Sequence, residues 1–187
     1  MAILTLRRAV IVAAALLALA AAPGRAQVAP APTEYQLKAV FLFNFSQFVD
    51  WPAAAFNDAQ SPLVIGVLGN DPFDGALDEI VRGETVNGRP LVVQRYQSIG
   101  EVETCHILFI DRSQAGQLDA VLAALKERSV LTIGDFEGFG RHGGIIRFVT
   151  VGNKIRLRIN LAAAQQAHLT ISSKLLRPAQ IVAPGED

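Results

Sequence analysis

The segment Gly138–Gly143 matches the pattern G-x-G-x-x-G, which in many proteins binds the pyrophosphate of a dinucleotide. In that motif a strand leads into the glycines and a helix leads out, so that the phosphates lie at the helix N-terminus. Here the exit segment, Ile145 to Val151, is rich in β-branched residues and predicts a strand. The helix that the chemistry needs is missing, so we interpret the segment as a mobile glycine-rich loop before a hairpin.

The other residues that could do chemistry are scattered. None of the histidines, His106, His142 and His168, has a second ligand at the i+3 or i+4 spacing typical of zinc sites. The only cysteine, Cys105, adjoins His106, and adjacent side chains of a strand point to opposite faces. The two therefore cannot act as a nucleophile and its base. We expect no metal, no cofactor and no catalysis, and an enzyme whose site is assembled only in space stays open.

The segment Lys154–Asn160 alternates strictly between polar and apolar residues, and its first three polar residues are basic. Such alternation predicts a half-buried strand, with Lys154, Arg156 and Arg158 on one face, about 7 Å apart at successive pairs. Three like charges in a row repel each other unless another group compensates them. This face is either a solvated edge that discourages aggregation or a docking surface for an acidic partner or a small anion.

These segments fit an α/β fold. Short apolar runs alternate with helical patterns, which implies a mostly parallel central sheet flanked by helices. Two further strands, joined by Gly152-Asn153, predict a C-terminal antiparallel hairpin. A helix capped by Asn160 and a short turn follow. The apolar runs span 63–68, 89–96, 106–110 and 130–133, the helices 70–82 and 113–126, the hairpin strands 145–151 and 154–159, and the last turn 172–176.

An unusually apolar helix is predicted to precede the sheet, over residues 34–51. Leu37, Phe41, Phe45 and Phe48 recur at helical spacing, and further apolar residues widen this face. A helix that is apolar on most sides is buried on most sides. We expect it to pack on the sheet with one face and on a second element, or a second subunit, with the other.

The N-terminus is typical of an export signal. Arg7 and Arg8 precede an apolar run from Ala9 to Ala22, and a cleavage site follows at Ala26. The run is shorter than the roughly 20 residues that a membrane-spanning helix needs, so we expect no transmembrane segment in the mature chain. We predict a signal peptide over 1–26, a linker over 27–33, a single α/β domain over 34–178 and a loose tail over 179–187.

The charge of the mature chain argues against nucleic acid as a partner. Cleavage would remove three arginines and no acidic residue, which leaves 14 basic and 17 acidic residues and a formal charge of −3. Nucleic-acid-binding proteins present a dense cationic surface instead. A secreted protein usually pairs its cysteines. The lone Cys105 lies in a strand-like apolar segment, so we expect it to be buried and inert, with an intermolecular bond as the alternative.

Several local sequences resemble the YfiR family of periplasmic signalling regulators. The specific matches are the aromatic segment from Glu34 to Pro52 and the closing segment from Ile171 to Leu176. The less specific matches are Gly88-Arg-Pro90, Gly143 to Phe148 and Ile155 to Ala164. Together the matches extend over nearly the whole mature chain.

This resemblance implies a periplasmic α/β protein, often dimeric, that binds the periplasmic sensor domain of an inner-membrane diguanylate cyclase and holds it inactive. Release would raise cyclic-di-GMP and favour biofilm growth. The resemblance places the repressing surface around the C-terminal hairpin. A small-molecule-binding module and, less favoured, an enzyme with a spatially assembled site are the alternatives. The predicted partner-binding residues are Ile146, Lys154, Arg156, Arg158 and Asn160.

Two departures from the family pattern affect this prediction. The resemblance implies two disulfides in the best-known members, but here only Cys105 matches a half-cystine. Gly66 occupies its partner position, and neither cysteine of the second bridge is present. We therefore do not expect redox control of that kind. In addition, an acidic family position falls on Arg158, which would invert part of the docking charge, and an aromatic position falls on Ile146.

Overall fold

A computed structural model describes residues 31–187, and the predicted signal peptide and most of the predicted linker lie outside this range. Residues from Pro32 onward form one compact unit. Its helices are α2 (Glu34–Phe48), α3 (Ala76–Val81), α4 (Leu118–Ala124), α5 (Leu161–Gln166) and α6 (Ser173–Leu176). Its strands are β1 (Val49–Asp50), β2 (Leu63–Leu68), β3 (Thr85–Val86), β4 (Arg89–Tyr96), β5 (Ile107–Ile110), β6 (Leu131–Gly134), β7 (Ile146–Val151), β8 (Lys154–Asn160), β9 (Thr170–Ile171) and β10 (Gln180–Val182).

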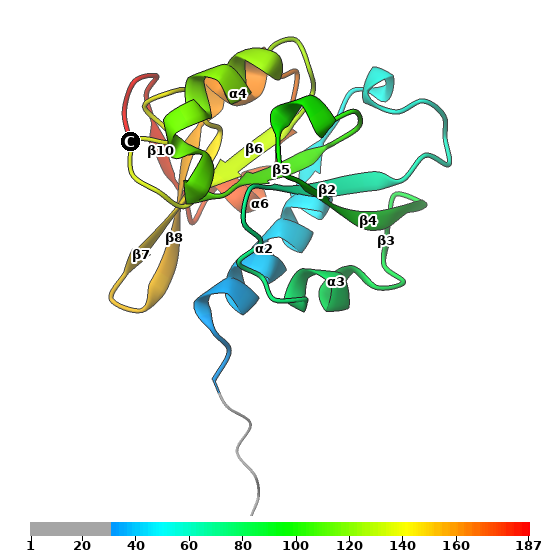
Figure 1. Cartoon of the computed structure of the whole chain (residues 1–187), viewed down its shortest axis with the longest axis horizontal. Helices are drawn as coiled ribbons and strands as arrows, with labels where there is room; N and C mark the ends of the chain where they lie inside the picture. The colour runs from blue at the N-terminus through cyan, green and yellow to red at the C-terminus, as the bar shows by residue number, and fades with distance from the viewer. Residues whose placement is uncertain (1–30) are drawn as a thin grey trace, which may run out of the picture. The chain divides into compact units, whose positions relative to one another are not determined.

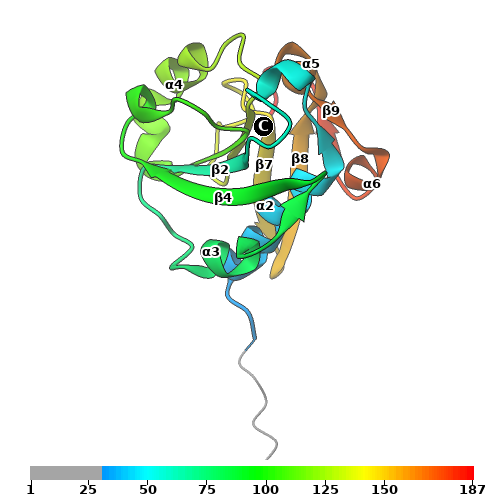
Figure 2. The same ribbon diagram turned by 90° about the vertical axis from the view of Figure 1, so that its right-hand side faces the viewer.

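The central sheet of the described domain has eight strands in the order β10-β8-β7-β6-β5-β2-β4-β3. The strands from β7 to β4 in this order run parallel, whereas β8 is antiparallel to β7 and β3 is antiparallel to β4. In Figure 1, α2 and α3 lie on one face of the sheet and α4 lies on the other. Figure 2 shows the same layers after a turn of 90°. The predicted α/β class, mostly parallel sheet and antiparallel hairpin are confirmed.

The sheet separates two hydrophobic cores. The larger core lies under α2, α3 and α6, where Phe45 of α2 stacks on Phe148 of β7 with 5.9 Å between ring centroids. Phe41 also contacts Phe148, at 5.8 Å. The smaller core lies under α4 and contains Leu118 and Phe139. Phe148 is almost completely buried against these rings. Aromatic packing therefore fixes the base of the hairpin to α2.

The opening helix begins where the sequence predicts. Thr33 accepts a hydrogen bond from the Gln36 amide, and the Gln36 side chain accepts one from the Thr33 amide, which forms a capping box. One side of α2 is buried as expected. On the other side Leu37 and Val40 are 39% and 43% exposed, so no described element covers them. A second subunit there stays a prediction.

Two predicted helices are shorter in the structure. The opening helix ends at Phe48 rather than at Trp51, because Val49–Asp50 pairs with Thr170–Ile171 as the small sheet β1–β9. Tertiary pairing thus replaces the last turn of the helix. The helix expected over 113–126 starts as the 3₁₀ helix Arg112–Gln117 and becomes α4 only at Leu118.

The helix expected over 70–82 begins only at Ala76. The Asp71 carboxylate accepts a hydrogen bond from the Phe73 amide, which stabilises a turn instead of a helix start. Gly75, with φ of 79°, then directs the chain into α3. The segment Asn70-Asp71-Pro72 therefore forms a turn rather than the first turn of a helix.

The chain end differs most from expectation, because the predicted loose tail is ordered. Gln180–Val182 forms β10 and pairs in parallel with Arg158–Asn160 of β8. The outer edge of β8 would otherwise carry unpaired backbone groups, and the tail satisfies those of Arg158–Asn160. A strand this short has too little periodicity to be recognised in a sequence.

The predicted hairpin turn and the predicted cap of the helix after β8 are confirmed. Asn87 and Gly88 both have positive φ, 53° and 78°, and join β3 to β4. Gly152 and Asn153, at 54° and 60°, likewise join β7 to β8, as a two-residue hairpin turn requires. The Asn160 side chain accepts a hydrogen bond from the Ala163 amide at 3.0 Å and caps α5. Among the described helices none is long and apolar enough to cross a membrane.

Candidate functional site

The outward face of the β7–β8 hairpin is the candidate functional site. The strands are in register, so that Val149 lies opposite Arg156. Side chains alternate along each strand. The intervening residues Phe148 and Leu157 are 1% and 4% exposed and belong to the core. The remaining side chains therefore share the opposite side, and we call this surface the hairpin face. It consists of Arg147, Val149, Val151, Lys154, Arg156 and Arg158.

The structure divides the five predicted contact residues into two groups. Lys154 and Arg156 are exposed and Arg158 is half-buried, all on the hairpin face. Ile146 is 0% exposed, because it lies two residues from Phe148 and points into the same core. Asn160 is 3% exposed. Ile146 and Asn160 therefore cannot contact a partner of the folded domain, which corrects that part of the prediction.

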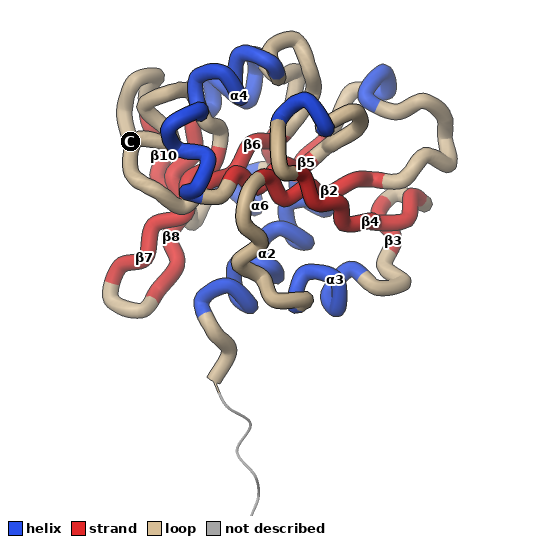
Figure 3. The backbone as a smooth tube through the Cα atoms, viewed as in Figure 1, coloured by secondary structure: helices blue, strands red, loops and turns tan. Residues whose placement is uncertain are grey.

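The outer half of the hairpin face is open. Val151 is 60% exposed, and Lys154 lies opposite it across the hairpin. Among the described residues, Lys154 and Arg156 form no ion pair. Figure 3 shows the hairpin extending away from α4 to the periphery of the domain. This half therefore combines two cations that have no ion-pair partner in the described domain with the exposed side chain of Val151. All three lie on a hairpin that is held by backbone hydrogen bonds.

The inner half of the hairpin face is occupied by the end of the chain. The Asp187 carboxylate forms an ion pair with Arg147, and Arg158 donates to the main-chain oxygen of Asp187. The amides of Gly138 and Gly140 donate to the same carboxylate, at 2.7 Å and 3.0 Å. Burial alone would raise the pKa of Asp187, but these hydrogen bonds and the Arg147 charge hold it below its usual range.

The glycine-rich loop that precedes β7 is packed rather than mobile, which corrects the sequence interpretation. Phe139 is 0% exposed, and its ring fills the space beside Gly134 and Gly144. A Cβ at these glycines would lie 2.5 Å and 2.1 Å from that ring. As the sequence indicates, a strand follows the loop, so the helix of a dinucleotide site does not follow it.

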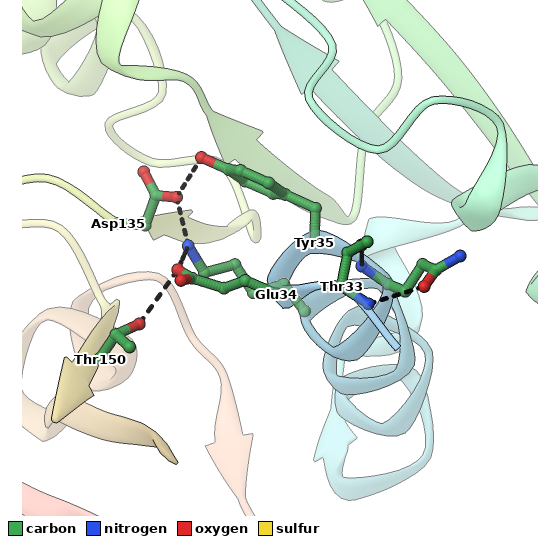
Figure 4. Close-up of polar contacts among 7 residues, drawn as sticks. Thr33, Glu34, Tyr35, Asp135 and Thr150 are labelled. Carbon is green, nitrogen blue, oxygen red and sulfur yellow. Dashed lines mark hydrogen bonds and ion pairs between the residues drawn. The ribbon is translucent and has the colours of Figure 1, made fainter. Parts of the chain in front are cut away.

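A second polar cluster lies where α2 begins. The Lys38 ammonium lies 2.6 Å from both Glu34 and Asp135, and Tyr35 donates to Asp135 at 2.9 Å (Figure 4). Lys38 is only 3% exposed. Thr150 at the hairpin tip donates to Glu34 at 3.0 Å. The cluster therefore joins α2, the end of β6 and the hairpin.

The titration behaviour of this cluster also favours a structural role. The hydrogen bond from Lys38 holds the pKa of Glu34 below its usual range. Burial and the Asp135 carboxylate raise the pKa of Tyr35 well above its usual value. A phenol that is held protonated is a poor base. The arrangement positions the hairpin against α2 rather than activating a nucleophile.

Cys105 and His106 lie on opposite faces of the sheet, as predicted. Cys105 is free and buried under α4, and burial raises the pKa of its thiol to about 12. His106 Nδ1 accepts from the Val64 amide at 3.0 Å, so Nε2 carries the hydrogen and donates to the Ala55 oxygen at 3.1 Å. Burial lowers the pKa of His106. Among the described residues, no group of three potential ligands could hold a metal ion.

Two neighbouring cavities lie beside the segments that lead into β5 and β6. Their volumes are about 460 Å³ and 550 Å³, and both are lined by Arg128, Val130 and His168. These sizes suit a small ligand. However, parallel sheets of this kind bind ligands beyond the carboxyl ends of their strands, whereas these cavities lie at the amino ends. The position of the two cavities therefore argues against the alternative function as a small-molecule-binding module.

Residues 35–180 match the family model described as DUF4154: YfiR/HmsC-like. The chain belongs to the YfiR/HmsC-like family. This family is regulatory rather than catalytic and is periplasmic, and its members act on a membrane signalling protein. Among curated proteins, no significant match to the chain was found. The family match includes the whole β7–β8 hairpin and stops at Gln180, before Asp187.

Sequence reasoning missed two residues of this YfiR/HmsC-like domain, Arg147 and Asp187. The hairpin turn fixes the register, so Arg147 could have been placed opposite Arg158. Two adjacent cations need an anion nearby. The position of that anion, 29 residues after Arg158 in sequence, carries no local signal.

Proposed function

We propose that this YfiR/HmsC-like protein is a periplasmic regulator that binds the periplasmic sensor domain of a membrane diguanylate cyclase and inhibits the enzyme. Family membership supports the class of function. The observation that carries the contact site is the outer half of the hairpin face, where Lys154 and Arg156 are exposed beside Val149 and Val151. Binding, without catalysis, is the activity that we assign to it.

The chemistry of this surface selects a partner that is acidic around an apolar centre. Interfaces bury apolar side chains at the centre and place charges at a polar rim. Here Val151 supplies the exposed apolar group, and Lys154 and Arg156 supply cations on the neighbouring strand. A rigid hairpin loses less conformational entropy on docking than a loop does.

The competing interpretation is a solvated edge. The short strand β10 pairs with β8 only over Arg158–Asn160, so the segment from Lys154 to Leu157 keeps an unpaired edge. Lysine and arginine commonly protect such edges from aggregation. A charge of either sign protects an edge from aggregation, whereas an acidic partner needs a positive charge. Charge reversal therefore separates the two roles.

The test compares two double charge reversals in the full-length protein in its own host. Lys154→Glu/Arg156→Glu alters the hairpin face, and Arg82→Glu/Arg112→Glu makes the same change in net charge at exposed sites elsewhere. Loss of the protein should raise cyclic-di-GMP. The control variant should restore a low level, and the hairpin variant should not. Equal restoration by both variants would reject the hairpin face as the contact site.

A binding measurement makes the same test in vitro. With the purified periplasmic domain of the cyclase, the hairpin variant should associate at least about tenfold more slowly than the control variant at low salt. The difference should shrink at high salt, because rim charges are screened. Unchanged affinity at both salt concentrations would show that the cations are only a solvated edge.

A further inference from the structure

Two arginines stand side by side on the inner half of the hairpin face. Arg147 and Arg158 are a cross-strand pair, and the Arg147 side chain is only 14% exposed. Like charges directly opposite each other destabilise a hairpin. The pair is tolerated because the Asp187 carboxylate, whose side chain is 6% exposed, contacts Arg147 while the Asp187 main chain contacts Arg158. This place in the fold therefore requires an anion.

The glycine-rich loop completes the surroundings of that anion. The amides of Gly138 and Gly140 converge on the one carboxylate, as main-chain amides do around phosphates and other anions. A Cβ on Gly140 would lie 3.0 Å from the Glu186 oxygen, so a side chain here would crowd the tail. The glycine-rich motif does not form a nucleotide site, but it still presents two converging main-chain amides.

The Asp187 side chain does not reach both arginines. Its carboxylate contacts Arg147 and the two amides, whereas Arg158 donates to the Asp187 main-chain oxygen. A tetrahedral oxyanion offers more acceptor oxygens and more negative charge than one carboxylate. Such an anion can therefore accept hydrogen bonds from both arginines and from the amides at once.

The tail that carries Asp187 is only locally attached. Beyond β10, residues 183–186 are exposed. Ala183 and Glu186 bond to each other through a short turn. Asp187 is then the contact that returns the tail to the sheet. A tethered carboxylate of this kind acts at an effective concentration in the millimolar range, which a free anion can match.

We propose that Gly138, Gly140, Arg147 and Arg158 form an oxyanion-binding site whose preferred occupant is phosphate, and that Asp187 is a built-in competitor for it. Binding of phosphate displaces the carboxylate and releases residues 183–187 from the sheet. The inner half of the hairpin face then loses the cover of residues 183–187, next to the open outer half. The inference concerns the inner half and is independent of the proposed function.

The first experiment measures thermal unfolding of the full-length protein in inorganic phosphate and in chloride of equal ionic strength. Asp187→Asn removes the side-chain charge that competes for the site, and Glu186→Gln is the matched control, since it removes the same charge from an exposed neighbour. At about ten times the dissociation constant, phosphate should raise the midpoint of Asp187→Asn by about 4 °C. The rise should be clearly smaller for Glu186→Gln and wild type. Equal shifts in all three, or none, overturn the proposal.

The second experiment locates the bound ion. In the Asp187→Asn background, Arg158→Met should abolish the phosphate shift, whereas Arg156→Met, the same change two residues away on the hairpin face, should preserve it. Arg147→Met is a second variant in case Arg158→Met unfolds. A shift that survives both Arg147→Met and Arg158→Met places the ion elsewhere and rejects the site.

The third experiment follows the tail in wild-type protein. Hydrogen exchange of the peptide that covers residues 180–187 should accelerate in phosphate, and exchange of the loop 136–144 should slow. Succinate in place of phosphate distinguishes a carboxylate ligand from a tetrahedral one. A larger effect of phosphate supports the proposal, and an effect of succinate that equals or exceeds it overturns phosphate as the preferred occupant. Exchange that is the same in phosphate, succinate and chloride overturns the competition between tail and ligand.

Discussion

The two halves of the hairpin face carry the same kind of charge, but only one half is compensated within the chain. Arg147 and Arg158 at the inner end contact Asp187, which the glycine loop also binds. Lys154 and Arg156 at the outer end form no ion pair among the described residues. Basic residues at the same spacing along β8 therefore have two different roles. Arg158 binds another part of the chain, whereas Lys154 and Arg156 remain exposed to solvent. The difference is that, within the described domain, the tertiary structure places a carboxylate beside the inner cations and none in ion-pair contact with the outer ones.

Loss of the aromatic support under both halves should have the largest effect. Phe45 is fully buried and stacks on Phe148 at the base of the hairpin. Phe45→Ala should lower the free energy of unfolding by about 3–5 kcal/mol, as large core truncations do. Phe41 is only half-buried, so Phe41→Ala should cost less. Chemical denaturation measures both, and equal costs would refute this ranking of the two rings.

The next largest effect compares one arginine from each half. Arg147→Met leaves the carboxylate of Asp187 without its ion-pair partner, and should lower the free energy of unfolding by about 2 kcal/mol. Arg156→Met removes an exposed cation without an ion pair and should change it by less than about 0.5 kcal/mol. Urea unfolding of the two variants tests the comparison, which fails if their stabilities agree.

The sequence predicted the strands of this face better than the contacts between them. Alternation correctly placed Leu157 in the core and Arg156 outside, because a strand has a strict period of two. The same rule places Ile146 with Phe148 in the core. Its predicted contact with a partner came from the family resemblance rather than from alternation, and its burial does not fit that role.

Long-range contacts limited prediction of the site itself. The tail from Ala179 was expected to be loose, yet Gln180–Val182 pairs with the open edge of β8. The compensation of Arg158 by Asp187 is equally non-local. Local patterns therefore indicated which side chains face outward, but not which of them remain available to a partner.

The ion pair of the inner half should make stability depend on pH in the acid range. The pKa of Asp187 is lower in the folded protein than its ordinary value. Its contribution is therefore complete above the unfolded pKa, about 3.9, and is lost as the pH falls through the folded value. The stability difference between wild type and Asp187→Asn should be constant from about pH 7 to 5 and shrink below about pH 4. A difference that persists undiminished at about pH 2 contradicts the assignment.

The smallest effect concerns what keeps the outer half in place. Thr150 at the hairpin tip donates to Glu34, which Lys38 holds at the start of α2. This bond is exposed, so Thr150→Ala should lower the free energy of unfolding by only about 0.5 kcal/mol. Hydrogen exchange at the tip should nevertheless accelerate, and the Lys154–Arg156 surface should bind its partner more weakly because more entropy is lost on docking. Thr150→Ser keeps the hydroxyl and should restore both properties. If Thr150→Ala binds as tightly as Thr150→Ser, then the bond to α2 does not preorganise the outer half.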